Sequence, residues 1–166
     1  ATLGRPLPGC QRGAPPLSRA RAPPLGYAAG MRESVVLVTG ANGEIGHGLI
    51  DRLFARGERI VTLDVAVLDP ALTEKCVECV QGSILDKAML SRLVSQYDVR
   101  AIHHLAAMLS TRAEFTPTAA HDVNVQGTLN LLELAAEQTE WSGHRVKFMF
   151  PSSIAVYGLP DLETKE

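Results

Sequence analysis

The sequence predicts an α/β fold in which a doubly wound parallel sheet is flanked by helices. Three observations carry this prediction. Short β-branched runs alternate with helical segments from residue 31 onward, as expected for successive β-α-β units. A glycine-rich turn joins the first run to the first helix. An aspartate closes the second run.

The first elements follow from residue type and spacing. Residues 35–39 are a β-branched run typical of a buried strand. A helix is expected from Glu44 to Ala55 and is ended by Gly57. One face of this helix carries its apolar residues, which are Ile45, Leu49, Ile50, Leu53 and Phe54. Strands are expected next at residues 60–63 and 76–80.

The later elements continue the alternation. Asp86 is expected to cap a helix that runs to Gln96 and turns its apolar residues inward, namely Met89, Leu90, Leu93, Val94 and Tyr97. A fourth strand is expected at residues 101–105, a long helix at 118–137 and a fifth strand at 146–150. The predicted sheet is therefore truncated after its fifth strand.

Composition restricts the class of protein. The chain has 166 residues, a net charge of −2, 46% hydrophobic and 20% charged residues, which is typical of one soluble domain. The near balance of acidic and basic residues predicts no nucleic-acid partner. The sequence contains no run of about 20 apolar residues, so no membrane span is expected. Three cysteines are too few for a disulfide framework, which favours a reducing, cytoplasmic location.

The first 30 residues differ from the rest. They hold six prolines and four arginines but no acidic residue, so residues 31–166 carry all 18 acidic residues. We interpret residues 1–30 as an upstream stretch before Met31, a disordered tail or a transit peptide, although six prolines argue against the helix of a transit peptide. Residues 31–166 are expected to form one incomplete domain.

Gly40, Gly43 and Gly46 have the spacing GxxGxxG between the first strand and the first helix. The first glycine permits a tight turn, the second lets the backbone approach a pyrophosphate, and the third lets the helix pack closely. The intervening Asn42, Glu44 and Ile45 place backbone amides at a helix N-terminus, which attracts phosphates. This context predicts a Rossmann-type dinucleotide-binding domain.

Asp64 supports the same prediction. It ends the second expected strand, 18 residues after Gly46, where an acidic residue binds the adenosine ribose hydroxyls. Its charge would repel a 2′-phosphate, so the expected cofactor is NAD rather than NADP. The alternative is an aspartate that only caps the turn before Val65.

The GxxGxxG spacing resembles that of the extended short-chain dehydrogenase/reductase family, which includes nucleotide-sugar epimerases and dehydratases. Four further segments resemble its motifs in the same order, namely residues 82–86, 104–107, 124–130 and 152–158. The resemblance implies that Ser83 and Ile84 contact adenine. It also implies that Leu105, Ala106 and Ala107 lie against the ribose and phosphates, with Asn124 in the same cofactor site.

The resemblance also implies the chemistry. Ser153 matches a catalytic serine that hydrogen-bonds the reacting oxygen of a small-molecule substrate while hydride passes to or from nicotinamide. The base of this family is the tyrosine of a Tyr-x-x-x-Lys motif, which this sequence lacks. We therefore expect the chain to be the front part of an NAD-dependent enzyme and to be inactive alone.

The expected substrate follows from the particular residues that occupy two of the motifs. Residues 106–110 and 150–158 resemble the L-threonine dehydrogenase branch, while sugar-acid dehydrogenases and nucleotide-sugar epimerases or dehydratases remain alternatives. Ser110 and Thr111 are candidates for substrate contact or are solvated loop hydroxyls. An alternative of another class is a non-catalytic NAD(P)-binding sensor or scaffold.

Three features have simpler interpretations. Cys76 and Cys79 lack further ligands nearby and, on a strand, would point to opposite faces, so no metal site is expected. His103 and His104 also point to opposite faces, and one is expected to pack within the layers. The 118–137 helix is apolar nearly all round, which indicates burial on two sides, by a second copy as in this family or by more of the chain.

Overall fold

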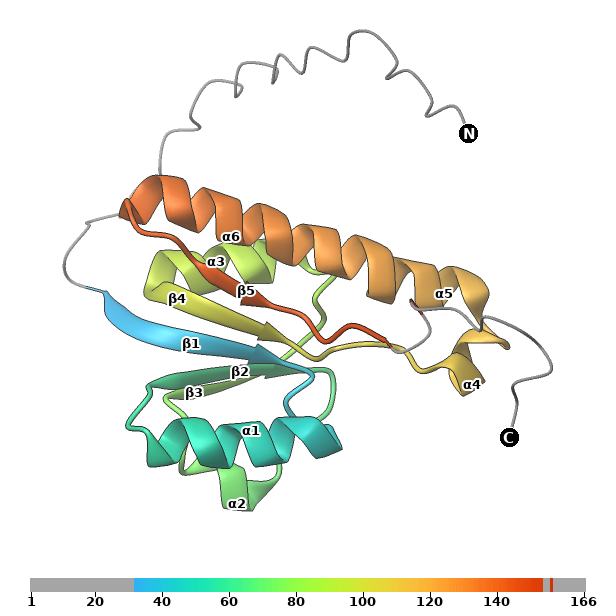
Figure 1. Ribbon diagram of the computed structural model, residues 1–166, viewed down its shortest axis with the longest axis horizontal. Helices are drawn as coiled ribbons and strands as arrows, with labels where there is room; N and C mark the ends of the chain where they lie inside the picture. The colour runs from blue at the N-terminus through green and yellow to red at the C-terminus, as the bar shows by residue number, and fades with distance from the viewer. Residues whose placement is uncertain (1–31, 154–155, 157–166) are drawn as a thin grey trace, which may run out of the picture.

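The computed structural model describes residues 32–153 and Val156, and it contains a parallel sheet of five strands (Figure 1). The strands are β1 (Glu33–Thr39), β2 (Ile60–Asp64), β3 (Glu78–Gln81), β4 (Tyr97–His104) and β5 (Lys147–Met149). Their order in the sheet is β3-β2-β1-β4-β5, and every neighbouring pair is parallel. The predicted Rossmann-type α/β fold is confirmed, while the interpretation of residues 1–30 lies outside the described residues.

Helices cover both faces of the sheet (Figure 1). One face carries α1 (Glu44–Ala55) and α2 (Pro70–Thr73), and the other carries α3 (Lys87–Gln96) and α6 (Thr128–Ser142). Each face has its own apolar core, built around Ile50 on the α1 side and around Leu131 on the α6 side. The Asp86 carboxylate accepts a hydrogen bond from the Met89 amide, as expected for the cap of α3.

The apolar face of α1 is narrower than predicted. Ile50 and Leu53 are buried, whereas Ile45 is 67% exposed and Phe54 is 50% exposed. Ile45 directly precedes the buried Gly46 in the sequence, and Phe54 directly follows the buried Leu53. One residue rotates the side chain by about 100°, which turns both of these residues away from the sheet. Their prediction as inward residues was therefore wrong.

The expected helix at 118–137 is a composite. The structure has α5 (Pro117–His121), a π-helical segment (Asp122–Gly127) and then α6, and a further short helix, α4 (Ser110–Ala113), precedes them. Along α6, Leu131 and Leu134 are buried against the sheet. The opposite side exposes an apolar stripe of Val125, Leu129 and Leu132, each more than 40% exposed. The stripe is exposed in the described residues of this single chain, so its burial by a second copy or by more of the chain stays a prediction.

Cys76 and Cys79 share one side of the sheet, contrary to the prediction. Strand β3 begins only at Glu78, so Cys76 precedes it, and both side chains pack against the core on the α1 side. Burial, together with the neighbouring Cys79 thiol, raises the pKa of Cys76 to about 12. In the part of the chain that the structure describes, no cluster of three or more His, Cys, Asp or Glu residues could hold a metal.

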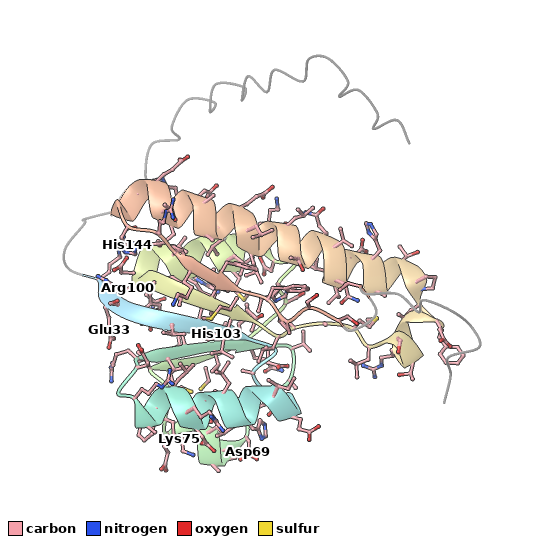
Figure 2. The ribbon with its side chains drawn as sticks, viewed as in Figure 1. Glu33, Asp69, Lys75, Arg100, His103 and His144 are labelled. Carbon is pink, nitrogen blue, oxygen red and sulfur yellow. The ribbon has the colours of Figure 1, made fainter. Side chains whose placement is uncertain are left out.

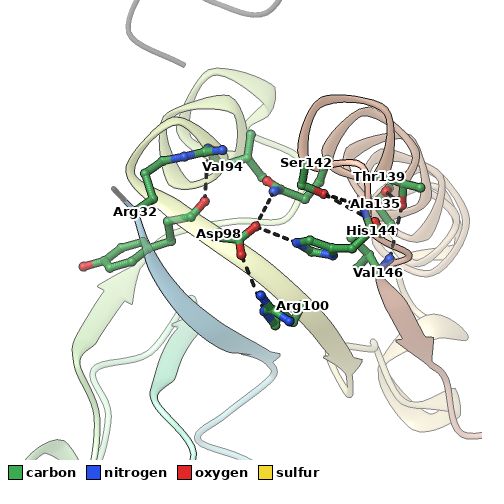
Figure 3. Close-up of polar contacts among 11 residues, drawn as sticks. Arg32, Val94, Asp98, Arg100, Ala135, Thr139, Ser142, His144 and Val146 are labelled. Atoms are coloured by element: carbon green, nitrogen blue, oxygen red, sulfur yellow. Dashed lines mark hydrogen bonds and ion pairs between the residues drawn. The ribbon is translucent and has the colours of Figure 1, made fainter. Parts of the chain in front are cut away.

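Ion pairs and hydrogen bonds fix the helices at the ends of the sheet. Lys75, which is labelled in Figure 2, follows α2, and its Nζ lies 2.6 Å from Asp51 Oδ1 of α1. At the amino-terminal ends of the strands, Asp98 Oδ1 accepts hydrogen bonds from Gln138 Nε2 (3.0 Å) and His144 Nε2 (2.8 Å), which ties β4 to α6 (Figure 3). Among the described residues, no helix has the length and apolarity needed to cross a membrane.

Candidate cofactor-binding site

A cavity of about 680 Å³ opens at the carboxyl ends of β1, β2 and β4. Strands β2 and β3 lie on one side of β1, and strands β4 and β5 lie on the other side. The strand order therefore reverses direction at β1, and such a switch point is where open α/β sheets bind ligands. Its volume is within the usual range for small-molecule sites of about 300–1,000 Å³. Three segments that the sequence singled out separately meet around this cavity.

The glycine turn forms the central part of the wall. Gly40, Asn42 and Gly43 line the cavity. Gly40 has a φ of +67°, and a Cβ atom there would lie 2.5 Å from the Ala106 nitrogen, so the turn can approach β4 this closely only with glycine. The neighbouring Glu44, Ile45 and Gly46 do not line the cavity. They form the first turn of α1, which has no side-chain cap and leaves its amides available to an anion.

Asp64 caps the turn that follows β2 and also lines the cavity. Its Oδ2 accepts a hydrogen bond from the Asn42 amide and its Oδ1 from the Ala66 amide, both at 2.9 Å. The carboxylate therefore fixes the glycine turn and the following loop, and it also lines the cavity. A carboxylate has about four acceptor positions, so two remain for ribose hydroxyls.

Ser83 and Ile84 line the cavity on its β3 side, and their contact with adenine stays a prediction. Ser83 Oγ accepts a hydrogen bond from the Leu85 amide (3.2 Å), which shapes the turn. The Ile84 carbonyl accepts a hydrogen bond from Asn130 Nδ2 (3.1 Å), so a side chain of α6 fixes the backbone of this wall. The sequence did not single out Asn130 as a site residue, although it ends the motif that begins at Asn124.

Asn124 acts on the cavity indirectly. Its side chain accepts a hydrogen bond from the Met108 amide (2.7 Å) and donates one to the Met108 carbonyl (3.0 Å). The residue lies in the π-helical segment and does not itself line the cavity. It therefore fixes the loop after β4, which is a positioning role that sequence spacing could not reveal.

That loop supplies the remaining wall. Leu105, Ala106, Ala107 and Thr111 line the cavity, whereas Ser110 is exposed and does not; their contacts to cofactor or substrate stay predictions. Arg112 also lines the cavity and was not singled out from the sequence. No signal for Arg112 exists in spacing alone, because the short helix α4 that places it was not predicted.

His104 is buried at the base of this loop. Its Nδ1 lies 2.8 Å from Thr39 Oγ1, and its Nε2 lies 2.9 Å from Thr128 Oγ1. Because the Thr128 hydroxyl donates to the Asn124 carbonyl (2.7 Å), it accepts from Nε2, and Nδ1 accepts from Thr39. Burial lowers the pKa of His104, which favours this neutral form. His104 thus joins β1, β4 and α6 and confirms the expected packing of one histidine.

Ser153 lies after β5, is exposed and is not among the residues that line the cavity. Its carbonyl accepts a hydrogen bond from the Val156 amide (3.2 Å). Residues 154, 155, 157 and 158 of the same motif lie outside the described residues. The catalytic role of Ser153 therefore stays a prediction.

Known proteins are similar to this chain in sequence and in fold. D-erythronate dehydrogenase of Cupriavidus necator is 34% identical over 134 residues, which cover 74% of this chain and 40% of that protein. UDP-glucose 4-epimerase of Mycolicibacterium smegmatis is 37% identical over 131 residues, covering 75% of this chain and 40% of that protein. Among solved structures, L-threonine dehydrogenase of Clostridium difficile has a TM-score of 0.63 and 32% identity over 75% of this chain and 38% of its own.

The chain spans about two fifths of the length of these relatives. Residues 36–166 match the NAD dependent epimerase/dehydratase family, whose cofactor is NAD. The match includes the second half of β1 with the glycine turn, Asp64, the loop after β4 and the segment around Ser153. This chain therefore belongs to the NAD-dependent epimerase/dehydratase family.

Proposed function

We propose that this chain is the NAD-binding part of an oxidoreductase that transfers hydride between a secondary hydroxyl group and nicotinamide. The observation that carries the proposal is the meeting of the glycine turn, Asp64 and the loop after β4 around one cavity. In this proposal the free amides in the first turn of α1 hold the pyrophosphate and Asp64 holds the adenosine ribose. Ser153 hydrogen-bonds the reacting oxygen of the substrate.

The proposed substrate is a small hydroxy acid. The sequence resemblance to L-threonine dehydrogenases and the similarity to D-erythronate dehydrogenase support this choice, because threonine and erythronate are both hydroxyl-bearing carboxylates. UDP-glucose 4-epimerases are similar to the same degree, so epimerisation of a nucleotide sugar is the alternative activity. Since the sequence has no Tyr-x-x-x-Lys motif, we expect this chain to bind NAD without hydride transfer.

Titration of the chain with NAD and NADP tests the cofactor site. We expect NAD to bind more tightly than NADP, and Asp64→Ala to weaken NAD by at least about tenfold, because charged hydrogen bonds to the ribose are lost. Asp64→Ala should affect NADP less, since it also removes repulsion of the 2′-phosphate. Asp51→Ala is the matched control, because it removes a carboxylate from the exposed surface of α1. Equal losses for both cofactors would refute the ribose role.

We further propose that a second copy of the chain covers the exposed stripe of Val125, Leu129 and Leu132. These residues recur at helical spacing on the side of the composite helix that faces away from the sheet. Leu129→Arg should reduce the mass measured by analytical ultracentrifugation to that of a monomer, while Glu140→Arg on the same helix should not. A wild-type monomer would refute the proposal. We also propose a cytoplasmic location, because the three cysteines of the sequence are too few for a disulfide framework.

A further inference from the structure

Arg112 is a charged residue of the cavity wall that has no role in the proposed NAD site. Among the described residues that line the cavity, it is the only one with a cationic side chain, and Asp64 is the only one with an anionic side chain. Asp64 already accepts two backbone hydrogen bonds at the β2 side. The guanidinium of Arg112 has no hydrogen bond or ion pair to any described residue, so its five donors are available to a ligand.

The backbone that carries Arg112 is fixed. The Arg112 amide donates to the Leu109 carbonyl (3.0 Å), and the Arg112 carbonyl accepts from Thr116 Oγ1 (3.0 Å). Two hydrogen bonds from Asn124 hold the nearby Met108 peptide. The fold therefore positions the backbone of Arg112 beside the cavity, and its exposed side chain extends from this fixed point.

The surroundings of Arg112 strengthen its attraction for an anion. The neighbouring wall consists of Leu105, Ala106, Met108 and Leu109, which offer apolar side chains. A ligand that fills this side of the cavity excludes water, and charge pairs are stronger in such a medium than in solvent. The planar guanidinium also matches a carboxylate with two parallel hydrogen bonds.

The sheet order indicates which part of a ligand would meet Arg112. Asp64 follows β2, the glycine turn follows β1, and Arg112 follows β4, so the three lie in that order across the sheet. A dinucleotide with its ribose at Asp64 and its pyrophosphate at the glycine turn extends its nicotinamide toward the β4 side. An anion at Arg112 would then belong to the substrate.

We propose that Arg112 binds the carboxylate of a small hydroxy acid beside the nicotinamide and thereby selects this substrate class over uncharged alcohols. This inference rests on the proposed function, because it requires NAD in the cavity. It adds the group that recognises the substrate. The pyrophosphate of NAD is the other source of an anion, and the experiment separates the two.

The experiment uses the protein as its complete gene encodes it. Wild type, Arg112→Gln, Arg112→Lys and the control Arg92→Gln, an exposed arginine of α3, are compared. NAD affinity is measured by titration, and kcat and KM are measured with L-threonine, D-erythronate and L-threoninamide, which lacks the carboxylate. We expect Arg112→Gln to raise KM for the preferred acid by about ten- to a hundredfold with NAD affinity changed less than twofold. Arg112→Lys should restore part of the loss, and Arg92→Gln should behave as wild type.

Three results would overturn the inference while the protein still binds NAD. One is an unchanged KM in Arg112→Gln. Another is a tenfold loss of NAD affinity with KM unchanged, which would assign Arg112 to the pyrophosphate. The third is turnover of L-threoninamide that equals or exceeds that of both acids, or no turnover of either acid. Failure of the wild-type protein to bind NAD would instead refute the proposed function itself.

Discussion

Gly46 and Gly48 lie two residues apart on α1 and should respond oppositely to alanine. A Cβ atom at Gly46 would lie 2.3 Å from the Ala41 carbonyl oxygen, whereas a Cβ atom at Gly48 would meet no atom within 4 Å. Alanine is favoured over glycine in a helix by about 1 kcal/mol. Gly48→Ala should therefore raise the free energy of unfolding by roughly 0.5–1 kcal/mol.

At Gly46 the steric cost exceeds this gain. Overpacking costs about 1–3 kcal/mol, and a backbone oxygen at this distance cannot rotate away, so the cost falls at the upper end. Gly46→Ala should lower the free energy of unfolding by about 2 kcal/mol, which corresponds to roughly 4–8 °C in Tm. It should also weaken NAD binding, because the glycine turn must shift.

Urea denaturation followed by circular dichroism measures both variants against wild type. The essential result is the difference of about 3 kcal/mol between two chemically identical substitutions on one helix. Equal effects of Gly46→Ala and Gly48→Ala would refute the reasoning, because they would show that α1 does not pack against the glycine turn as closely as the structure has it.

Three further predictions concern the polar and thiol groups. Asn124→Ala removes both hydrogen bonds to Met108, so NAD should bind roughly tenfold more weakly in titrations and the Met108 amide should exchange faster with deuterium; unchanged exchange would contradict this. Burial lowers the pKa of His104 below its usual 6.5, so the unfolded state binds more protons below about pH 6.5 and stability falls as pH decreases through this value. His104→Asn should make this pH dependence shallower in urea titrations at pH 5–7.5, with His103 retaining its own share, and an identical slope would count against it. The raised pKa of Cys76 should slow its alkylation by iodoacetamide at pH 8 at least about tenfold relative to the urea-unfolded chain, as read by peptide mass spectrometry, and equal rates would disprove this.

The order and type of the main elements could be predicted because their signals are local. Residues Glu44–Ala55 combine a preceding glycine turn, helical spacing of apolar residues and Gly57, and the observed α1 has these bounds. Asp86 likewise marks the start of α3 by its own side chain. Where caps and periodicity agree, the sequence alone is sufficient.

Features that depend on neighbouring elements could not be predicted. Hydrophobicity placed Ile45 on the inner face, but the position of α1 over the sheet decides that Gly46 is buried and Ile45 is not. The strict alternation assumed for Cys76 and Cys79 failed because β3 begins after Cys76. In the first case tertiary packing overrides the local pattern, and in the second the expected start of the strand was wrong.

The residues of the candidate site also fall into two groups, those with a local signal in the sequence and those without one. The glycine turn and Asp64 have a fixed spacing, and the structure places both at one cavity. The supporting roles of Asn124 and Asn130 depend on hydrogen bonds to peptides far away in the sequence, which no spacing rule contains. Arg112 reaches the cavity only because a short helix follows β4.

The position of β1 at the centre of the sheet has a consequence for biosynthesis. One edge of β1 pairs with β2 soon after both strands leave the ribosome, but its other edge pairs with β4, which begins at Tyr97. At about 5–20 residues per second, this second edge waits several seconds for its partner. The wall that contains Arg112 is made later still, so NAD can stabilise the nascent chain only after the loop beyond β4 has been translated.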